Sequence, residues 1–342
     1  MITITSLAQY FNYIKFPEYT MKFGNKTDNK EILSIVNETK LSDKATRAQR
    51  ENEINSLWMR IKQYSSQMYK DALNNYYVDG LLVDKVYFRG LSKSTYTNVP
   101  GIYRNNLPKN KDENYFFNEM QVRCPSAFQS QKNINKLTYM QHYGCPTRLL
   151  DITLNPLVAL YFACIHDGDF DGVVHVFGVK NSDISYEQSD KVQMLSKLAE
   201  FKKSEQDLIL KLSYIYLNKG KFPQNSSGRY IDTIIERYYH SIKRDNGAFE
   251  RDIVPLDLLK PLIVQVPRDN PRILKQDGAF IMAALDIDEK DSAQKIDTYS
   301  VEQIIVPANY KLSLLKELEQ VCISQATLFP EVDQVADYLK KN

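Results

Sequence analysis

Cysteine is scarce in this chain of 342 residues, and its distribution argues against two common kinds of site. The four cysteines form no Cys-x-x-Cys pair, and no histidine lies at metal-ligand spacing from them. The sequence therefore predicts neither a zinc centre nor a disulfide framework, and we expect no metal cofactor. Because no apolar run is long enough to cross a membrane and no segment has the features of a signal peptide, we expect a cytoplasmic protein without a membrane partner.

An excess of charge of either sign is also missing, since 44 basic side chains stand against 42 acidic ones. The chain therefore lacks the overall basic character that is typical of nucleic-acid-binding proteins. A Gly-rich phosphate loop, a Gly-x-Ser-x-Gly nucleophile elbow and a paired-carboxylate signature are absent as well. These absences argue against P-loop nucleotide chemistry and against hydrolysis by an elbow serine.

What the chain does have is one unusual segment, residues 140–163, in which a polar loop and a short strand lead into an apolar helix. The strand is predicted over 148–153, and its alternation places Asp151 and Thr153 on one face. Asn155 is a suitable N-cap, and the proline that follows suits the first helical turn. Polar side chains at a strand end that face a helix N-terminus indicate a site for an anionic or polar ligand. The alternative is a capping network that fixes the loop.

Two further residues of this segment have a functional and a structural interpretation. His142, which follows Gln141, is predicted to act as a general acid or base or as a ring that stacks on a ligand. Its structural alternative is a loop histidine that bonds to the backbone. Arg148 is either a ligand-binding side chain or a buried arginine that pairs with Asp151 across the strand end.

The rest of the chain alternates irregularly between helical and strand patterns. Apolar residues recur at helical spacing over residues 45–77, 192–201, 206–217 and 231–242, which predicts helices. Strands are predicted at 86–88, 172–178, 262–266, 278–284 and 302–306. Strands separated by helical blocks without regular βαβ alternation indicate an α+β fold with a mixed or split sheet. We divide the chain into a mainly helical segment at residues 1–80 and one domain at residues 81–335, with a helical insert at about 183–250.

Several short motifs follow one another in a fixed order. They are Tyr-Phe-Arg-Gly at 87–90, Gln-His-Tyr-Gly at 141–144, Pro-Thr-Arg-Leu-Leu-Asp at 146–151 and Asn-Pro-Leu-Val-Ala-Leu-Tyr-Phe-Ala at 155–163. Together they resemble the FRG domain, which is named for its Phe-Arg-Gly. Later stretches agree, among them Leu-Phe-Pro at 328–330, a hydrophobic tail that we expect to clasp the body of the domain.

The order of three strand motifs is also similar to that of the arginine-class ADP-ribosyltransferases. Arg89 matches their early-strand arginine, Asp151-Ile152-Thr153 matches their Ser-Thr-Ser strand, and Glu302-Gln303 matches their late strand. The resemblance implies a transferase-like sheet and NAD as the substrate. Two departures weaken it: a carboxylate replaces the first hydroxyl, and Gln303 falls at the position of the transferase glutamate, where an amide cannot supply the negative charge.

The chemistry of a nucleotide substrate explains why these residue types occur together. An arginine pairs with a pyrophosphate, a hydroxyl positions the ribose, and a carboxylate stabilises the oxocarbenium-like charge that forms as nicotinamide leaves. The catalytic candidates are therefore Arg89, His142, Asp151, Thr153 and Glu302. The ligand-binding candidates are Gln141, Arg148, Asn155 and Gln276, with Arg104 and Arg272 as further phosphate clamps.

Three functions stay open on the sequence alone. The first is an NAD-consuming enzyme, either an ADP-ribosyltransferase with a macromolecular acceptor or a glycohydrolase. The second is a non-catalytic module that senses a nucleotide or a nucleic acid in the same cleft. The third is an interaction scaffold whose helices at 183–250 bind a protein partner. Bacterial phage defence is the biological role that such a domain would suit.

Overall fold

The computed structural model describes residues 2–14, 47–73, 82–104, 107–108, 111–129, 131–222, 230–250, 253–268 and 270–341. These ranges form an α+β fold around a mixed, open sheet of eight strands in the order β1-β8-β4-β2-β3-β7-β6-β5. The predicted fold class is confirmed. The predicted helical segment at 1–80 falls only partly inside the described ranges, because residues 15–46 and 74–80 lie outside them.

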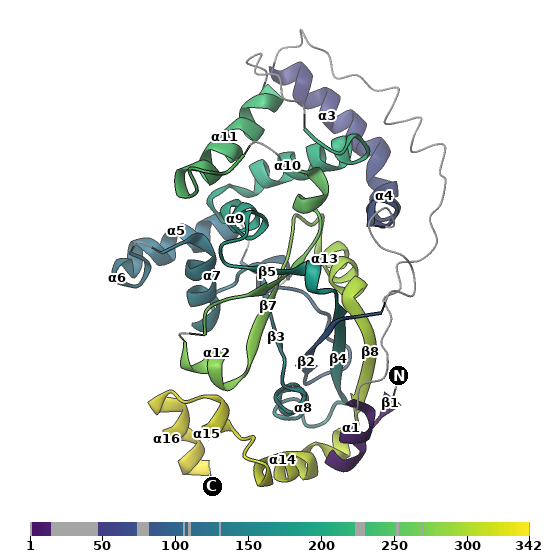
Figure 1. The fold of residues 1–342 in the computed structure, drawn as a ribbon, viewed down its shortest axis with the longest axis vertical. Helices are drawn as coiled ribbons and strands as arrows, with labels where there is room; N and C mark the ends of the chain where they lie inside the picture. Colours follow the sequence, from purple (N-terminus) through teal and green to yellow (C-terminus); the bar gives the residue numbers. More distant parts are fainter. Residues whose placement is uncertain are drawn as a thin grey trace.

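The strands occur close to where the sequence places them. Their bounds are β1 Ile2–Thr3, β2 Lys85–Leu91, β3 Leu149–Thr153, β4 Gly172–Val179, β5 Ile184–Tyr186, β6 Leu262–Gln265, β7 Gly278–Met282 and β8 Ser300–Val306. In Figure 1 the upper end of the molecule is made of α3 Arg47–Ile61, α4 Ser65–Leu73, α10 Lys203–Tyr216 and α11 Tyr230–Asp245. No helix in the described part of the chain is long and apolar enough to span a membrane.

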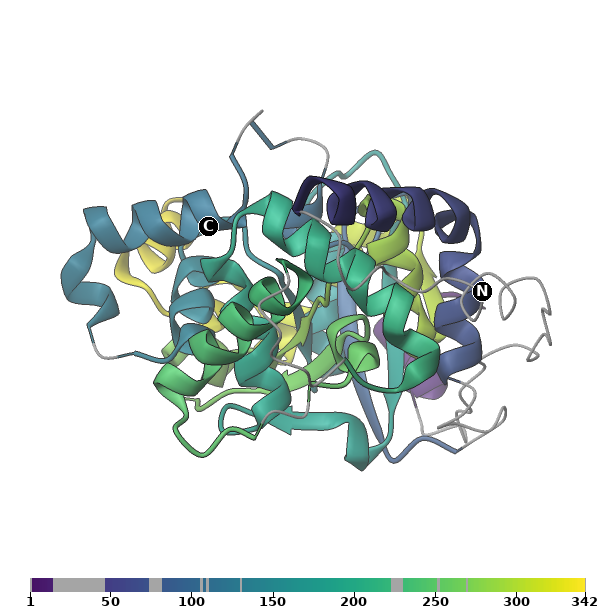
Figure 2. The same ribbon diagram turned by 90° about the horizontal axis from the view of Figure 1, so that it is seen from above.

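Helices cover both faces of the sheet and enclose two hydrophobic clusters. The first cluster is built on α3 Arg47–Ile61, α4 Ser65–Leu73, α5 Glu113–Arg123, α6 Pro125–Phe128, α7 Asn133–His142, α9 Asp190–Lys197, α10 Lys203–Tyr216 and α11 Tyr230–Asp245. Trp58 of α3 packs against Tyr214 of α10, with 5.6 Å between ring centroids. Figure 2 shows this helical group from above.

The second cluster lies on the other face of the sheet. It is built on α1 Leu7–Ile14, α8 Pro156–Cys164 and α14 Lys311–Gln320. The remaining helices are α12 Pro271–Lys275, α13 Glu289–Ile296, α15 Gln325–Leu328 and α16 Val332–Lys341. In Figure 1 the helices α14, α15 and α16 form the lower end of the molecule, next to α8 and α12.

The sheet is divided between β2 and β3. β2 pairs with β4 along seven residues but with β3 at only one register position, Phe88 opposite Thr153. β3 pairs instead with β7 along its whole length. The sheet therefore consists of two four-stranded halves that meet at one residue pair and diverge beyond it, as the prediction of a split sheet requires.

One sequence expectation about this region is wrong. Residues 140–142 were expected to begin a polar loop, but they form the last turn of α7. The helix has buried Ile134, Leu137 and Met140 along one side, a three-residue spacing that places them on one helical face. His142 is therefore held on a helix end rather than on a loop.

Gly90 sets the distance between β2 and α8. A Cβ atom at this position would lie 1.8 Å from the carbonyl oxygen of Ala159 and 2.7 Å from the amide nitrogen of Ala163. Both atoms belong to the α8 backbone, so neither can move without shifting the helix. Glycine is thus required for α8 to lie directly on the strand.

We predict that Gly90→Ala lowers the free energy of unfolding by about 3 kcal/mol, because overpacking of this kind forces backbone shifts. Urea denaturation followed by circular dichroism measures the change. Gly168→Ala is the matched control, since a Cβ atom there meets nothing within 4 Å. Equal stability of the two variants would contradict the steric argument.

Candidate functional site

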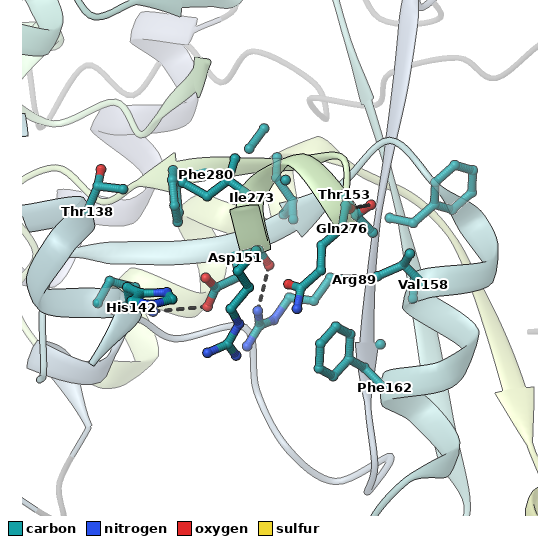
Figure 3. A pocket seen from close by; sticks show the side chains of 18 residues that line it. Arg89, Thr138, His142, Asp151, Thr153, Val158, Phe162, Ile273, Gln276 and Phe280 are labelled. Carbon is teal, nitrogen blue, oxygen red and sulfur yellow. Dashed lines mark hydrogen bonds between the residues drawn. The ribbon is translucent and has the colours of Figure 1, made fainter. Parts of the chain in front are cut away.

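A cavity of about 240 Å³ lies where β2 and β3 diverge. Its walls come from these two strands together with β7, α7, α8 and the region of α12. Figure 3 shows the side chains of Asp151, Arg89 and Gln276 between the ring of Phe280 on one side and the ring of Phe162 on the other. Six of the nine catalytic and ligand-binding candidates line it, namely Arg89, Gln141, His142, Asp151, Thr153 and Gln276.

Arg89 crosses the gap between the two halves of the sheet. Its Nη1 donates to the backbone carbonyl oxygen of Asp151 at 2.6 Å, whereas its Nε is buried and has no partner among the described residues. Burial lowers the pKa of the guanidinium to about 10, against the opposing effect of Asp151. The side chain therefore remains charged at neutral pH and places a fixed cation in the cavity.

The carboxylate of Asp151 is exposed to the cavity and is oriented by Gln141. Its Oδ2 accepts from Gln141 Nε2 at 2.9 Å, and Gln141 Oε1 accepts from the hydroxyl of Thr147 at 2.7 Å. Because Thr147 fixes the direction of the amide, one carboxylate oxygen is held while the other is free to meet a ligand. Asp151 is the side chain best placed to supply negative charge inside the cavity.

Thr153 and Asn155 take part in a capping network at the start of α8, and Gln276 supplies a backbone carbonyl oxygen to it. The Thr153 hydroxyl donates to the Gln276 carbonyl oxygen at 2.6 Å and accepts from the Asn155 amide at 2.9 Å. Asn155 caps α8 by accepting from the Leu157 amide, and it does not line the cavity. Thr153 and Gln276 do line it, so their hydrogen bonds fix part of the wall.

Arg148 lies on the opposite face of β3 from Asp151, and the predicted pairing of the two is wrong. Strand alternation separates them, and the fully buried guanidinium instead binds Glu113 of α5, with 2.8 Å between Nε and Oε1. A longer contact of 3.5 Å reaches Gln206. Arg148 therefore joins β3 to the helices behind it and is not part of the cavity wall.

We predict that Arg148→Met lowers the free energy of unfolding by about 3–5 kcal/mol, because it leaves the Glu113 carboxylate buried and unpaired. Replacing both partners, Arg148→Met with Glu113→Leu, is expected to restore most of that loss. Chemical denaturation of the single and double variants measures the difference. If the double variant is as unstable as Arg148→Met, the loss of stability does not come from an unpaired Glu113 carboxylate.

Glu302 is remote from the cavity. It lies on β8 opposite Val176 of β4, and β4 separates β8 from β2. Its Oε1 accepts from the Gln303 backbone amide at 2.9 Å. Gln303, not Glu302, is the cross-strand neighbour of His175, and His175 is in turn the cross-strand neighbour of Arg89. The spacing of the late-strand motif also placed Gln303, not Glu302, at the transferase position. The structure thus does not bring the late-strand carboxylate to the other candidates.

His142 and Arg272 both line the cavity, and they are close enough for the charge of Arg272 to affect the imidazole. Burial lowers the pKa of His142, and the positive charge of Arg272 lowers it further, so the imidazole is neutral at pH 7. Arg272 is the second cation of the cavity, whereas Arg104 binds the Val99 carbonyl oxygen outside it. No sequence pattern pointed to a functional role for the rings of Phe162 and Phe280, which also line the cavity.

His175 is buried directly behind Arg89. It is the cross-strand neighbour of Arg89, and its Nδ1 lies 3.1 Å from Asn98 Nδ2, so Nδ1 accepts and Nε2 carries the proton. Burial lowers the pKa of His175 to about 4, and the nearby Arg89 acts in the same direction. The histidine is therefore neutral at neutral pH, and protonating it opposes folding.

We predict that His175 makes the protein less stable as the pH falls. The folded-state pKa of about 4 lies below the unfolded value of about 6.5, so the unfolded chain binds the proton more tightly. Stability is retained above pH 6.5 and falls by about 3 kcal/mol as the pH drops to 4. The measurement is urea denaturation of the wild type and His175→Gln across this range. If the free energies of unfolding of the two proteins change in parallel with pH, the loss of stability does not come from His175.

No cluster of three or more histidine, cysteine, aspartate or glutamate side chains that could hold a metal ion occurs within the described ranges. Residues 84–172 match the family model of the FRG domain. The match includes β2, β3 and α8, and therefore Arg89, Gln141, His142, Asp151 and Thr153 of the cavity. No curated protein and no solved structure matches the chain.

Proposed function

Because the chain contains an FRG domain over residues 84–172, we propose that the cavity of this domain binds NAD and cleaves its N-glycosidic bond. The observation that carries the proposal is the arrangement of Arg89 and Asp151. A fixed cation and an exposed, oriented carboxylate lie on neighbouring strands and line the same cavity. Phosphate binding and the stabilisation of a developing positive charge need these two groups.

Both the charged and the aromatic side chains that line the cavity contribute to binding. The guanidinium groups of Arg89 and Arg272 supply donors for the phosphates, and the rings of Phe162 and Phe280 supply apolar surface for a planar base. The cavity is smaller than the roughly 300–1,000 Å³ of common ligand sites. It therefore encloses one half of the dinucleotide, and the other half extends beyond the rim.

The reaction that this arrangement favours is hydrolysis. The bond between C1′ of the ribose and the nicotinamide nitrogen breaks, and its electron pair leaves with nicotinamide. Asp151 stabilises the positive charge on the ribose. A water molecule then adds to C1′ and gives its proton to the neutral imidazole of His142, which leaves ADP-ribose. If the side chain of a macromolecular acceptor replaces water, the same steps transfer ADP-ribose.

A non-catalytic nucleotide sensor is the second candidate, and the position of Glu302 favours it. The transferase-like scheme needs a carboxylate from the late strand, but Glu302 lies two strands from Arg89 and outside the cavity. Asp151 alone must then serve as the acid. A sensor would retain the cations and aromatic rings but would release no nicotinamide.

We predict that purified protein releases nicotinamide from NAD and that Asp151→Asn slows release by about 10²-fold or more with little loss of binding. The asparagine oxygen can still accept from Gln141, so the cavity keeps its shape. Arg89→Lys is expected to weaken NAD binding about tenfold, because lysine cannot donate to the carbonyl and the phosphate in the same planar geometry. Chromatography measures release, and calorimetry measures binding.

Glu302→Gln is the matched control, since it makes the same carboxylate-to-amide change outside the cavity. It should alter neither release nor affinity. Binding without release would support the sensor, and the absence of both would reject NAD as the ligand. Loss of activity in Glu302→Gln but not in Asp151→Asn would overturn the assignment of the acid.

A further inference from the structure

The segment between α15 and α16, residues 328–331, lies against the rim of the cavity and is called the strap below. The Leu328 carbonyl oxygen accepts from Gln276 Nε2 at 3.1 Å. The Phe329 ring packs against Phe162, with 6.0 Å between centroids. Every one of these contacts engages a residue that lines the cavity. The expected clasp of the tail onto the body is therefore present, and it is located at the candidate site.

The strap also engages the charged rim of the cavity. The guanidinium of Arg272 lies over the Phe329 ring at 4.5 Å from its centroid. Glu331 Oε1 lies 3.6 Å from His142 Nε2. Glu331 Oε2 is buried and has no partner among the described residues. The strap thus carries a carboxylate to the side of the cavity where His142 and Arg272 meet, and half of that carboxylate is unsatisfied.

An unsatisfied buried carboxylate oxygen is unfavourable for the closed arrangement. The helix that follows the strap adds little to hold it, since α16 leaves Val332 86% exposed and Leu339 69% exposed. Within the strap, Leu328 is buried in the second hydrophobic cluster with 1% of its surface exposed, so it anchors the segment, and the part that can move is Phe329 to Glu331. Beyond Leu328, the strap is held by the contacts of Phe329 with Phe162 and Arg272 and of Glu331 with His142.

We propose that the strap is an autoinhibitory gate in which Glu331 occupies the place of a ligand phosphate beside His142 and Arg272. A nucleotide pyrophosphate binds there by displacing Glu331, because two anionic groups cannot share these partners. The proposal rests on the proposed function in one respect, namely that the ligand carries a pyrophosphate. The closed strap lowers the apparent affinity for the ligand. The apparent affinity equals the affinity of the open site multiplied by the fraction of molecules in which the strap is open.

The test uses the full chain with inorganic pyrophosphate and NAD as probes. Glu331→Gln removes the competing charge, and Phe329→Ala removes the stacking on Arg272 and Phe162. Each variant is expected to bind pyrophosphate about tenfold more tightly by calorimetry, because the closed state becomes less populated. Glu250→Gln, an exposed acid-to-amide change outside the cavity, is the control and should leave the affinity unchanged.

Hydrogen exchange of peptides that cover the strap gives an independent readout. Without ligand, exchange is expected to be faster in Glu331→Gln and Phe329→Ala than in the wild type. In the wild type, pyrophosphate should accelerate it. Slower exchange with ligand, or weaker pyrophosphate binding in both variants, would show a lid that closes on the ligand and would overturn the gate.

The two proposals fail in different ways. If exchange in the strap rises in both variants while no form binds NAD or pyrophosphate, the nucleotide assignment fails and the strap contact stands as a gate for another ligand. If exchange is unchanged in both variants, the gate is refuted whatever the affinity for NAD. Nicotinamide release by the wild type together with unchanged exchange would support the proposed function alone.

Discussion

The hydrogen bond from Arg89 to the backbone carbonyl of Asp151 is the interaction on which the cavity depends. Because β2 and β3 share one residue pair, the carbonyl groups along the gap lose their ladder partners. Backbone groups of this kind need a partner, and the guanidinium supplies a donor across the opening. A charged side chain therefore bridges the split between β2 and β3, and its own Nε has no partner among the residues that the structure describes.

Three consecutive residues, Phe88, Arg89 and Gly90, each determine a different part of the cavity. Phe88 makes the single register pair with Thr153 and fixes where the sheet halves touch. Arg89 spans the gap that begins there. Gly90 lets the backbone of α8 approach β2, which sets the position of Phe162 relative to the cation. A short motif can therefore specify a cavity because each of its residues constrains a different wall.

Local patterns predicted the parts of the site that depend on local geometry. Alternation along β3 predicted that Asp151 and Thr153 share one face, and both line the cavity, while the N-cap of α8 was readable from Asn155. Partners that are distant in the chain could not be read. Arg148 meets Glu113 from 35 residues earlier, and nothing near either residue signals the contact. The distance of Glu302 from the cavity could not be read from the sequence either. Neighbouring residues on a strand face opposite sides of the sheet, and the order of the strands decides which of them reaches the cavity.

The charges around the cavity connect the strap to the ligand. Arg89 and Arg272 supply two positive charges, and Asp151 and Glu331 supply two negative ones, so the closed site is balanced without a ligand. Moving the strap removes one of the negative charges and leaves an excess of positive charge at the rim. An anionic ligand gains most from that state, whereas a neutral ligand gains little. The site is therefore cationic only when the Glu331 carboxylate has moved away from it. The charge of the ligand is thereby coupled to the position of residues 328–331.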